Sequence, residues 1–314
     1  MIVLLILILE VVTIVQGGCP IRCTCTQNSI TCVQSSLEYV PYFESLDNNP
    51  VIIDLSGNPI TLIDIDDFSF DKSDQVKEIY LNSTSLSIID DHAFDELENL
   101  QELYLSDNLL HYFPEEIIRS NENMVLLDLS SNYFAEMPKI QSKSLEVLAI
   151  ANSRIERIGD DALDALPNLR ILLLQQNNLK SVNPVIFSGM NNLFFVGLAH
   201  NPWLCDCKTV ELFEFLISKR FVDVTEPVRC QNEKKIFVEL GGKCADFNVT
   251  KPSNEIIVTT EFDNDFYYAL MLFVAIITSL VLGATCGTCI TYKFLTRSVK
   301  MSESKNALLY DLRV

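Results

Sequence analysis

Apolar and polar residues follow a frame that returns along the chain at a near-constant interval. Residues 100–110 read LQELYLSDNLL, with apolar residues at positions 1, 4, 6 and 11 and asparagine at position 9. The steps between copies are 26, 24, 24, 21, 24 and 24 residues, and the copies begin at Pro50, Val76, Leu100, Met124, Leu145, Leu169 and Leu193. A period in this range predicts a solenoid of stacked turns, which presents a surface to another macromolecule and does not enclose a catalytic pocket.

Positions 4 and 6 predict one short strand in each repeat. Both are apolar in all seven copies, as at Leu103 and Leu105, so they point to one face and line up in a continuous core when repeats stack. At position 9, Asn can hydrogen-bond the backbone of its own turn. Thr84 and Ser153 replace it, and we expect weaker repeats there. The pattern predicts an α/β fold: a leucine-rich-repeat solenoid with a curved parallel sheet over residues 50–203.

Pairs of aspartates precede the apolar residues of several return limbs: Asp66 and Asp67, Asp90 and Asp91, Asp160 and Asp161. Paired carboxylates serve metal binding or acid–base catalysis in some proteins. Their recurrence at one phase of the repeat favours capping of short helical turns instead. The three histidines have no partner at ligand spacing, and no phosphate loop, nucleophile elbow or HExxH motif occurs. Residues far apart in a sequence can still form a catalytic triad in the folded protein. On the motifs alone, we predict no enzyme activity, no metal site and no cofactor.

The two ends of the chain indicate a membrane protein. Residues 1–18 are largely apolar and predict a cleaved signal peptide. An uncleaved anchor is the alternative, because this segment lacks the basic residues with which signal peptides usually begin. Residues 266–292 carry no charge over 27 positions and predict a transmembrane helix. Basic residues follow it, so residues 293–314 form a cytoplasmic tail and residues 248–265 a stalk outside the cell. We expect a single-pass type I protein of the plasma membrane.

Charge narrows the class of partner. The net charge is −19, and residues 19–265 hold 18 Lys or Arg against 39 Asp or Glu. Such an ectodomain repels nucleic acid, polyanions and anionic headgroups, and attracts basic proteins. Solubility alone is the simpler explanation of the same charge.

The cysteines form two clusters of four that flank the repeats. Both clusters lie outside the cell in this topology, so we expect disulfides and not zinc thiolates. Spacing by itself leaves three pairings open in each cluster. The two clusters are Cys19, Cys23, Cys25 and Cys32, and Cys205, Cys207, Cys230 and Cys244.

These clusters carry a resemblance to a family. The C-x3-C-x-C-x6-C run of residues 19–32 resembles the N-terminal cap of extracellular leucine-rich-repeat proteins, and NPWLCDC with the two later cysteines resembles their C-terminal cap. That family includes Slit-type modules, Toll-like and Trk-type ectodomains, neuronal adhesion proteins and the auxiliary γ subunits of large-conductance potassium channels. The resemblance implies disulfide-bonded caps over 19–49 and 204–247. It implies the bonds Cys19–Cys25, Cys23–Cys32, Cys205–Cys230 and Cys207–Cys244.

The concave surface of the predicted sheet is the candidate binding face. Positions 3, 5 and 7 alternate with core positions, so their side chains should face this surface. Its early half is acidic with two tyrosines, and its later half is apolar, as expected of an exposed contact patch. The alternative is that these are ordinary strand residues of high β-propensity. The predicted partner-binding residues are Glu78, Tyr80, Glu102, Tyr104, Asp128, Ile171, Leu173 and Phe195.

Several further sites follow from short motifs. Asn82 and Asn248 stand in N-x-S/T sequons and are predicted glycosylation sites. Gly283 and Gly287 have the GxxxG spacing that lets two helices approach, which favours a dimer, with chance as the alternative. Palmitoylation is predicted for two cysteines near the inner leaflet, Cys286 and Cys289.

Together these features predict a cell-surface protein that binds another extracellular or membrane protein through its repeats, as an adhesion protein or a receptor. The alternative is an auxiliary subunit of an ion channel. In that case the membrane helix and the basic residues after it would act on a neighbouring channel. The repeats would then have a supporting role, and the two hypotheses differ in which segment is essential.

Overall fold

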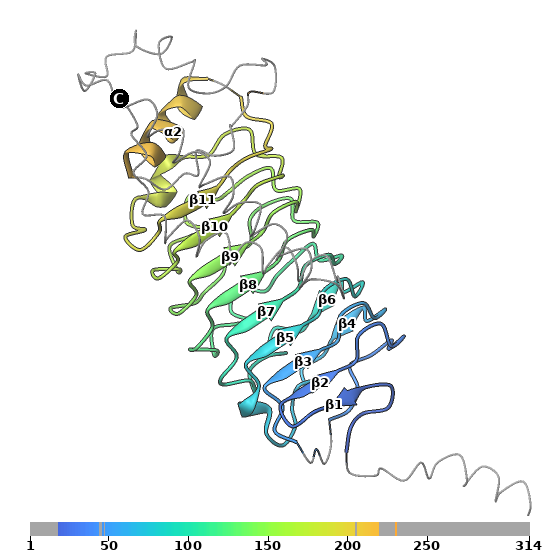
Figure 1. The fold of residues 1–314 in the computed structure, drawn as a ribbon. Helices are drawn as coiled ribbons and strands as arrows, with labels where there is room; N and C mark the ends of the chain where they lie inside the picture. The colour runs from blue at the N-terminus through green and yellow to red at the C-terminus, as the bar shows by residue number, and fades with distance from the viewer. Residues whose placement is uncertain (1–17, 44–45, 47, 205, 220–229, 231–314) are drawn as a thin grey trace, which may run out of the picture. The chain divides into compact units, whose positions relative to one another are not determined.

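The computed structural model describes residues 18–43, 46, 48–204, 206–219 and 230. Nine strands form one sheet in the order β1-β2-β3-β5-β7-β8-β9-β10-β11 (Figure 1). Strand β1 pairs antiparallel with β2, and every later pair is parallel. The bounds are β1 Thr24–Cys25, β2 Ser29–Thr31, β3 Ile52–Asp54, β5 Glu78–Tyr80, β7 Glu102–Tyr104, β8 Leu126–Asp128, β9 Val147–Ala149, β10 Ile171–Leu173 and β11 Phe195–Gly197.

The register of the sheet follows the repeat frame. Position 4 of each repeat pairs with position 4 of the next, as in Ile79 with Leu103 and Leu127 with Leu148. The second of these pairs joins the repeats that are only 21 residues apart, so the shorter turn is absorbed in the return limb and not in the strand. Position 4 is completely buried in all seven repeats. The predicted parallel-sheet solenoid is confirmed.

Phenylalanines fill the side of the solenoid opposite the sheet at its N-terminal end. Phe43, Phe68 and Phe94 come from the cap and the first two repeats, and their ring centroids are 6.3 Å and 5.8 Å apart in succession. All three side chains are buried. The core is therefore one continuous stack, and the cap closes it with a ring from its own chain segment.

A second, smaller sheet lies on the flank beside the main one. It pairs β4 (Leu62–Ile63) with β6 (Ile88–Ile89) in parallel, and Figure 1 shows both strands next to β3 and β5. Two 3-10 helices, η1 (Ser73–Gln75) and η2 (Pro184–Phe187), stand in return limbs. Among the described residues the only α-helix is α2 (Cys207–Lys219), after the last repeat.

Buried asparagines connect successive repeats at position 9. The Oδ1 atom of Asn108 accepts hydrogen bonds from the backbone N–H groups of Thr84, Ser85 and Leu86 at 3.0–3.1 Å. Its Nδ2 group donates to the carbonyls of Leu81 and Leu105. One amide therefore satisfies five backbone groups in two repeats, most of them buried, and each buried group left unsatisfied would cost free energy.

The two substitutions in this ladder join the repeats in different ways. The Ser153 hydroxyl accepts from the N–H of Asn132 at 3.4 Å and donates to the carbonyl of Leu129 at 3.1 Å, so it keeps two bonds to the preceding repeat. The Thr84 hydroxyl donates to the carbonyl of Leu81 in its own repeat and to Oδ1 of Asn108 in the next repeat. The weaker links expected at these two positions stay a prediction.

Disulfides hold the N-terminal cap. The structure contains Cys19–Cys25 and Cys23–Cys32, the two bonds that the resemblance implies for this end. At the other end, Cys207 and Cys230 each take part in a disulfide bond. The implied partners Cys244 and Cys205 lie outside the described residues, so the pairing of this cluster stays a prediction.

The C-terminal end of the core is covered by α2. Trp203 occupies the place of an aliphatic residue in the last repeat, is fully buried, and donates from Nε1 to the carbonyl of Leu198 at 3.1 Å. Phe213 of α2 meets its ring edge-on, with 5.4 Å between centroids. The side chain of Asp206 accepts from the N–H of Thr209 at 2.9 Å and so caps the first turn of the helix.

Several predicted features lie outside the described residues. These are the segments predicted as signal peptide up to residue 17, stalk, transmembrane helix and tail, with Asn248, Gly283, Cys286, Gly287 and Cys289. In the part of the chain that the structure describes, no helix is both long enough and apolar enough to cross a bilayer.

Candidate binding face

The concave face of the main sheet brings the predicted acidic and aromatic residues together. Parallel pairing sets Glu78 beside Glu102 and Tyr80 beside Tyr104, and then Asp128 beside Tyr104. Each of these side chains projects from position 3 or 5 of its repeat, on the side opposite the buried position 4. The register of three short strands therefore builds a compact cluster from residues 24 positions apart.

The two tyrosines form a stack that ends in two carboxylates. The ring centroids of Tyr80 and Tyr104 are 4.5 Å apart and the planes differ by 5°. Tyr104 is only 6% exposed, so the expectation that its ring is an open contact is wrong, whereas Tyr80 is half-buried. The Tyr80 hydroxyl donates to Glu78 at 2.9 Å, and the Tyr104 hydroxyl donates to Glu102 at 2.7 Å. Burial raises the pKa of each phenol, and the hydrogen bond to its glutamate raises it further. Both hydroxyls therefore stay neutral donors, and the negative charge of the cluster resides on the glutamates.

Asp128 is a buried acid at the end of this cluster. Its side chain is 3% exposed, and its Oδ1 accepts from the N–H of Ser130 at 2.9 Å. Burial raises the pKa of this carboxyl above its ordinary value, opposed by the hydrogen bonds from Ser130. The sequence-based expectation of a solvent-facing carboxylate is wrong here, because neighbouring side chains in register cover it. Asp128 therefore does not offer an open contact.

We predict that replacing Asp128 increases the stability of the fold, by an amount that depends on pH. Asp128→Asn keeps the acceptor for Ser130 and removes a buried charge, so we expect it to raise the free energy of unfolding at pH 7 by about 1 kcal/mol. The pKa of Asp128 is higher in the folded protein than the value near 3.8 that it has in the unfolded chain. Its charge therefore destabilises the folded state fully at a pH above the folded pKa, and not at all at a pH below the unfolded pKa. Urea unfolding at pH 7 and pH 4 should show the gain shrinking as pH falls.

Asp54 supplies the matched control for this test. It stands at the same repeat position and accepts from the N–H of Ser56 at 3.0 Å, but it is only half-buried. Asp54→Asn should change stability less at pH 7. An equal gain in both variants, or a gain for Asp128→Asn that grows on acidification, would contradict the assignment.

The later half of the concave face is less open than the sequence predicts. Val147, Ala149 and Ile171 are buried, because strands in register pack their small and branched side chains against one another. Only Leu173 and Phe195 among the predicted apolar contacts remain partly exposed. The expected broad apolar patch is wrong and is reduced to this pair.

Gln175 adds a polar atom that the sequence did not point to. Its Oε1 is buried and has no hydrogen-bond partner among the described residues. It lies against Gly197, where a Cβ atom would come within 2.6 Å of it. The glycine of the last strand therefore gives the Gln175 amide its room on this face.

Asn82 lies on the same face, and its side chain is occupied. Its Oδ1 accepts from both the N–H and the hydroxyl of Ser106 at 3.0 Å. Thr84, the third residue of the sequon, is buried in the asparagine ladder. Glycosylation of Asn82 stays a prediction, and a glycan there would cover the acidic end of the concave face.

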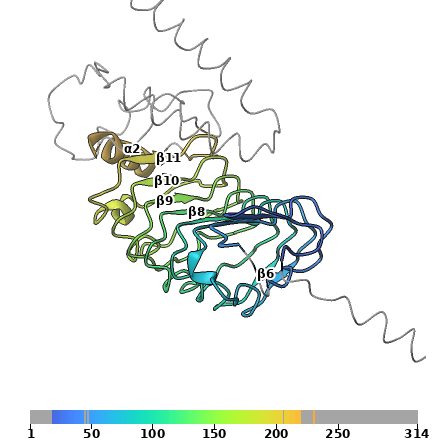
Figure 2. The ribbon, with the colours of Figure 1, turned by 60° about the horizontal axis from the view of Figure 1, so that its bottom comes forward.

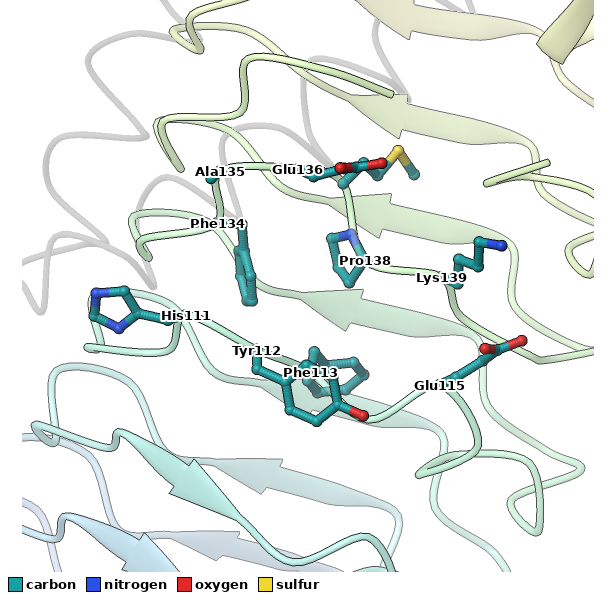
Figure 3. A pocket seen from close by; sticks show the side chains of 10 residues that line it. His111, Tyr112, Phe113, Glu115, Phe134, Ala135, Glu136, Pro138 and Lys139 are labelled. Atoms are coloured by element: carbon teal, nitrogen blue, oxygen red, sulfur yellow. The ribbon is translucent and has the colours of Figure 1, made fainter. Parts of the chain in front are cut away.

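A shallow hollow of about 400 Å³ opens on the flank between the third and fourth repeats (Figure 3). Aromatic and charged side chains line it, among them Tyr112, Phe113, Glu115, Glu136 and Lys139. No sequence motif pointed to it, because its lining comes from two segments 24 residues apart.

In the described part of the chain, no group of three His, Cys, Asp or Glu residues is placed to hold a metal ion.

The fold and the face define the class of this protein as a solenoid whose successive turns each add one strand to a single sheet (Figure 2). Residues 51–110 and 143–202 match the leucine rich repeat family model. Human platelet glycoprotein IX is 38% identical over 73 residues, which cover 23% of this chain and 41% of that protein. Human leucine-rich repeat-containing protein 70 is 34% identical over 65 residues, 21% of this chain and 10% of that protein. These two stretches of the chain are thus leucine-rich repeats.

More distant relatives agree on the repeats. The peroxidasin homolog pxn-2 of Caenorhabditis elegans is 29% identical over 83 residues, 25% of this chain and 6% of that protein. The chain thus spans less than half the length of each of these relatives. The crystal structure of human 5T4, a trophoblast glycoprotein, superposes with a TM-score of 0.50 and 20% identity, covering 73% of this chain and 98% of that one. This last similarity concerns the fold alone.

Proposed function

We propose that this protein acts at the cell surface and binds a basic region of another extracellular or membrane protein through its concave face. The observation that carries the proposal is the Tyr80–Tyr104 stack with a glutamate on each hydroxyl. Because Tyr104 is buried, Tyr80 supplies the accessible ring of this stack. A ring beside two carboxylates suits an arginine or lysine side chain, which stacks on the ring and pairs with the acids. Leu173 and Phe195 extend the contact with apolar area.

The similarity to platelet glycoprotein IX supports passage through the secretory route, since that protein is named as a glycoprotein. The predicted membrane helix over 266–292 would anchor the chain at the plasma membrane. An adhesion or receptor role needs the repeats to make the essential contact. A channel-subunit role needs the segment 266–314 instead. Exchanging that segment for an unrelated span and tail should leave partner binding intact under the present proposal and abolish the function under the alternative.

Tyr80→Ala is the decisive variant. Truncating an aromatic anchor at the centre of an interface costs at least about 1.4 kcal/mol, which is a tenfold loss of affinity. The full chain, fused outside the cell to a proximity-labelling enzyme, would first identify neighbours on living cells. Binding of each purified neighbour to wild-type and Tyr80→Ala chains is then measured by surface plasmon resonance.

Tyr133→Ala is the matched control, because Tyr133 is also half-buried and stacked, on His111 with 5.3 Å between centroids, but lies on the flank. A neighbour that binds directly should lose affinity with Tyr80→Ala and keep it with Tyr133→Ala. If every directly binding neighbour has the same affinity for the wild type and for Tyr80→Ala, the concave-face proposal is wrong.

A further inference from the structure

Four large apolar side chains stand exposed in a row on the flank of the solenoid, away from the concave face. They are Tyr39, Leu62, Ile88 and Tyr112, with exposed fractions of 75%, 41%, 60% and 69%. One comes from the N-terminal cap and one from each of the first three repeats. All four occupy position 13 when the cap is counted in the register that pairs β2 with β3. We call this row the flank ridge.

The backbone forces these side chains outward. The following residue is buried in each repeat, at Ile63, Ile89 and Phe113, so its neighbour at position 13 must face solvent. Strands β4 and β6 set Leu62 directly opposite Ile88. Tyr39 and Tyr112 lie outside these two strands, but their repeats are joined to the neighbouring ones as strands of the main sheet. Neighbouring strands lie about 4.8 Å apart, so four copies of position 13 extend over roughly 14 Å along the stack.

The ridge is a true concentration of apolar surface. Tyr42 and Ile65, both exposed and both at position 16, widen it. Six of the thirteen large apolar side chains that are exposed in the described part of the chain thus lie on this flank. In the next two repeats position 13 is Glu136 and Arg157, which pair with each other at 3.1 Å, so the ridge ends there. Clustered exposed apolar residues of this kind mark a contact surface.

The charge around the ridge restricts its occupant. Residues 37–118 hold 19 Asp or Glu against two Lys and no Arg, whereas residues 119–219 hold eleven against nine. Exposed carboxylates from Glu38, Asp64, Asp91 and Glu115 lie within three residues of the ridge along the chain. An anionic membrane would be repelled, and so would a second copy placed ridge against ridge. The complementary occupant is apolar along its centre and basic along its sides.

The spacing of the ridge distinguishes a helix from a strand. A helix offers one apolar side chain per 5.4 Å turn, so over three gaps it drifts by about 2 Å from a 4.8 Å ladder. An extended strand repeats on one face about every 6.7 Å and drifts by roughly 6 Å, more than one whole step. We propose that the flank ridge binds a basic amphipathic helix of another protein, about three turns long.

The hollow of Figure 3 extends this site. Tyr112, the last residue of the ridge, also lines the hollow, and Glu115 stands on the same wall. A lysine or arginine near the end of the bound helix would place its aliphatic stem against Tyr112 and its charge near Glu115. The occupant is thus recognised by a row of apolar side chains and by a basic residue beyond the row.

The test uses two labelled peptides of one composition. Both are 14 residues of leucine and lysine, one with leucines at i, i+3, i+4 and i+7 and the other with strict alternation. Binding to the full chain in neutral phosphatidylcholine nanodiscs is followed by fluorescence anisotropy. We expect the helical pattern to bind at least tenfold more tightly than the alternating one. The double variant Ile88→Ser with Tyr112→Ser should reduce that binding at least tenfold.

Val185→Ser is the matched control, because Val185 is also 60% exposed but lies in η2, outside the acidic half. It should bind the helical peptide as the wild type does, and so should Tyr80→Ala, which separates this site from the concave face. Circular dichroism checks that each variant is folded. Equal affinity for the two peptides, or unchanged affinity in the double variant, would overturn the proposal. The proposal would also be overturned if the wild type bound anionic vesicles, or associated with itself, and the double variant did not.

Discussion

Asn108→Ala should lower the free energy of unfolding by about 4 kcal/mol or more, one of the largest effects available to a single substitution in this chain. The side chain is 2% exposed and bridges two repeats. Its loss leaves the N–H groups of Thr84, Ser85 and Leu86 and the carbonyls of Leu81 and Leu105 without their partner. Each buried unsatisfied group costs on the order of 1–3 kcal/mol, partly recovered as water enters. Guanidinium unfolding followed by far-UV circular dichroism measures the change.

Two further variants show whether the ladder is the cause. Asn108→Ser copies the residue found in the fifth repeat and should cost roughly half as much, since one hydroxyl replaces part of the amide's bonds. Asn178→Ala removes an exposed asparagine whose one hydrogen bond, to the carbonyl of Arg154, is 3.5 Å long. It should cost less than about 0.5 kcal/mol. A loss below about 1 kcal/mol for Asn108→Ala would show that the ladder does not stabilise the repeats.

Phe213→Ala should destabilise the C-terminal end by about 3 kcal/mol or more. Its ring is 2% exposed and covers the edge of Trp203, so truncation leaves a cavity over the last repeat. Trp203 is the chain's single tryptophan, and its fluorescence therefore reports on this end alone. We expect the emission to shift to the red at a lower denaturant concentration than in the wild type. In a solenoid each repeat contacts only its neighbours, so the circular dichroism of the other repeats should be lost later.

Phe215→Ala gives the comparison on the same helix. Phe215 is only partly buried and lies under the ammonium group of Lys219, 6.0 Å from its ring centroid. Its truncation should cost about 1 kcal/mol or less. The unfolding midpoints measured by Trp203 fluorescence and by circular dichroism should then stay close together. If both variants shift the Trp203 transition equally, the packing of Phe213 on the indole is not what secures the cap.

Local pattern was sufficient for the fold because position 4 of every repeat is buried by its own neighbours and by nothing distant. The strand positions and the seven repeats could be predicted from the pattern, whereas the disulfide-bonded N-terminal cap followed from a family resemblance, since spacing left its pairing open. Pattern did not indicate the left-handed backbone at position 8, where Asp107, Ser131, Gln176 and His200 have φ of 56–59°. These residue types are not specific to that conformation, and only the stacked turn forces it on them.

For the binding face, the alternation of a strand indicated which side chains share a surface, and the pairing of Tyr80 with Tyr104 followed from the repeat length. Alternation says nothing of how deep a side chain lies. Tyr104, Asp128 and Ile171 were expected to be open and are covered, because packing between strands depends on the sizes of residues in the neighbouring repeats. The flank ridge was missed for a related reason, since position 13 carries no motif and its four members meet only across repeats.

By itself the sequence determined the solenoid, the places where its strands lie and the acidic character of its first half, all of which depend on residue type and period. The tertiary structure decided which of the concave side chains are accessible, which buried amide oxygens are left without a partner among the described residues, and that Tyr39, Leu62, Ile88 and Tyr112 form one surface. The physical reason is distance along the chain. Burial and contact are properties of residues brought side by side by stacking, and the period predicts that they are neighbours without predicting how their side chains fill the space.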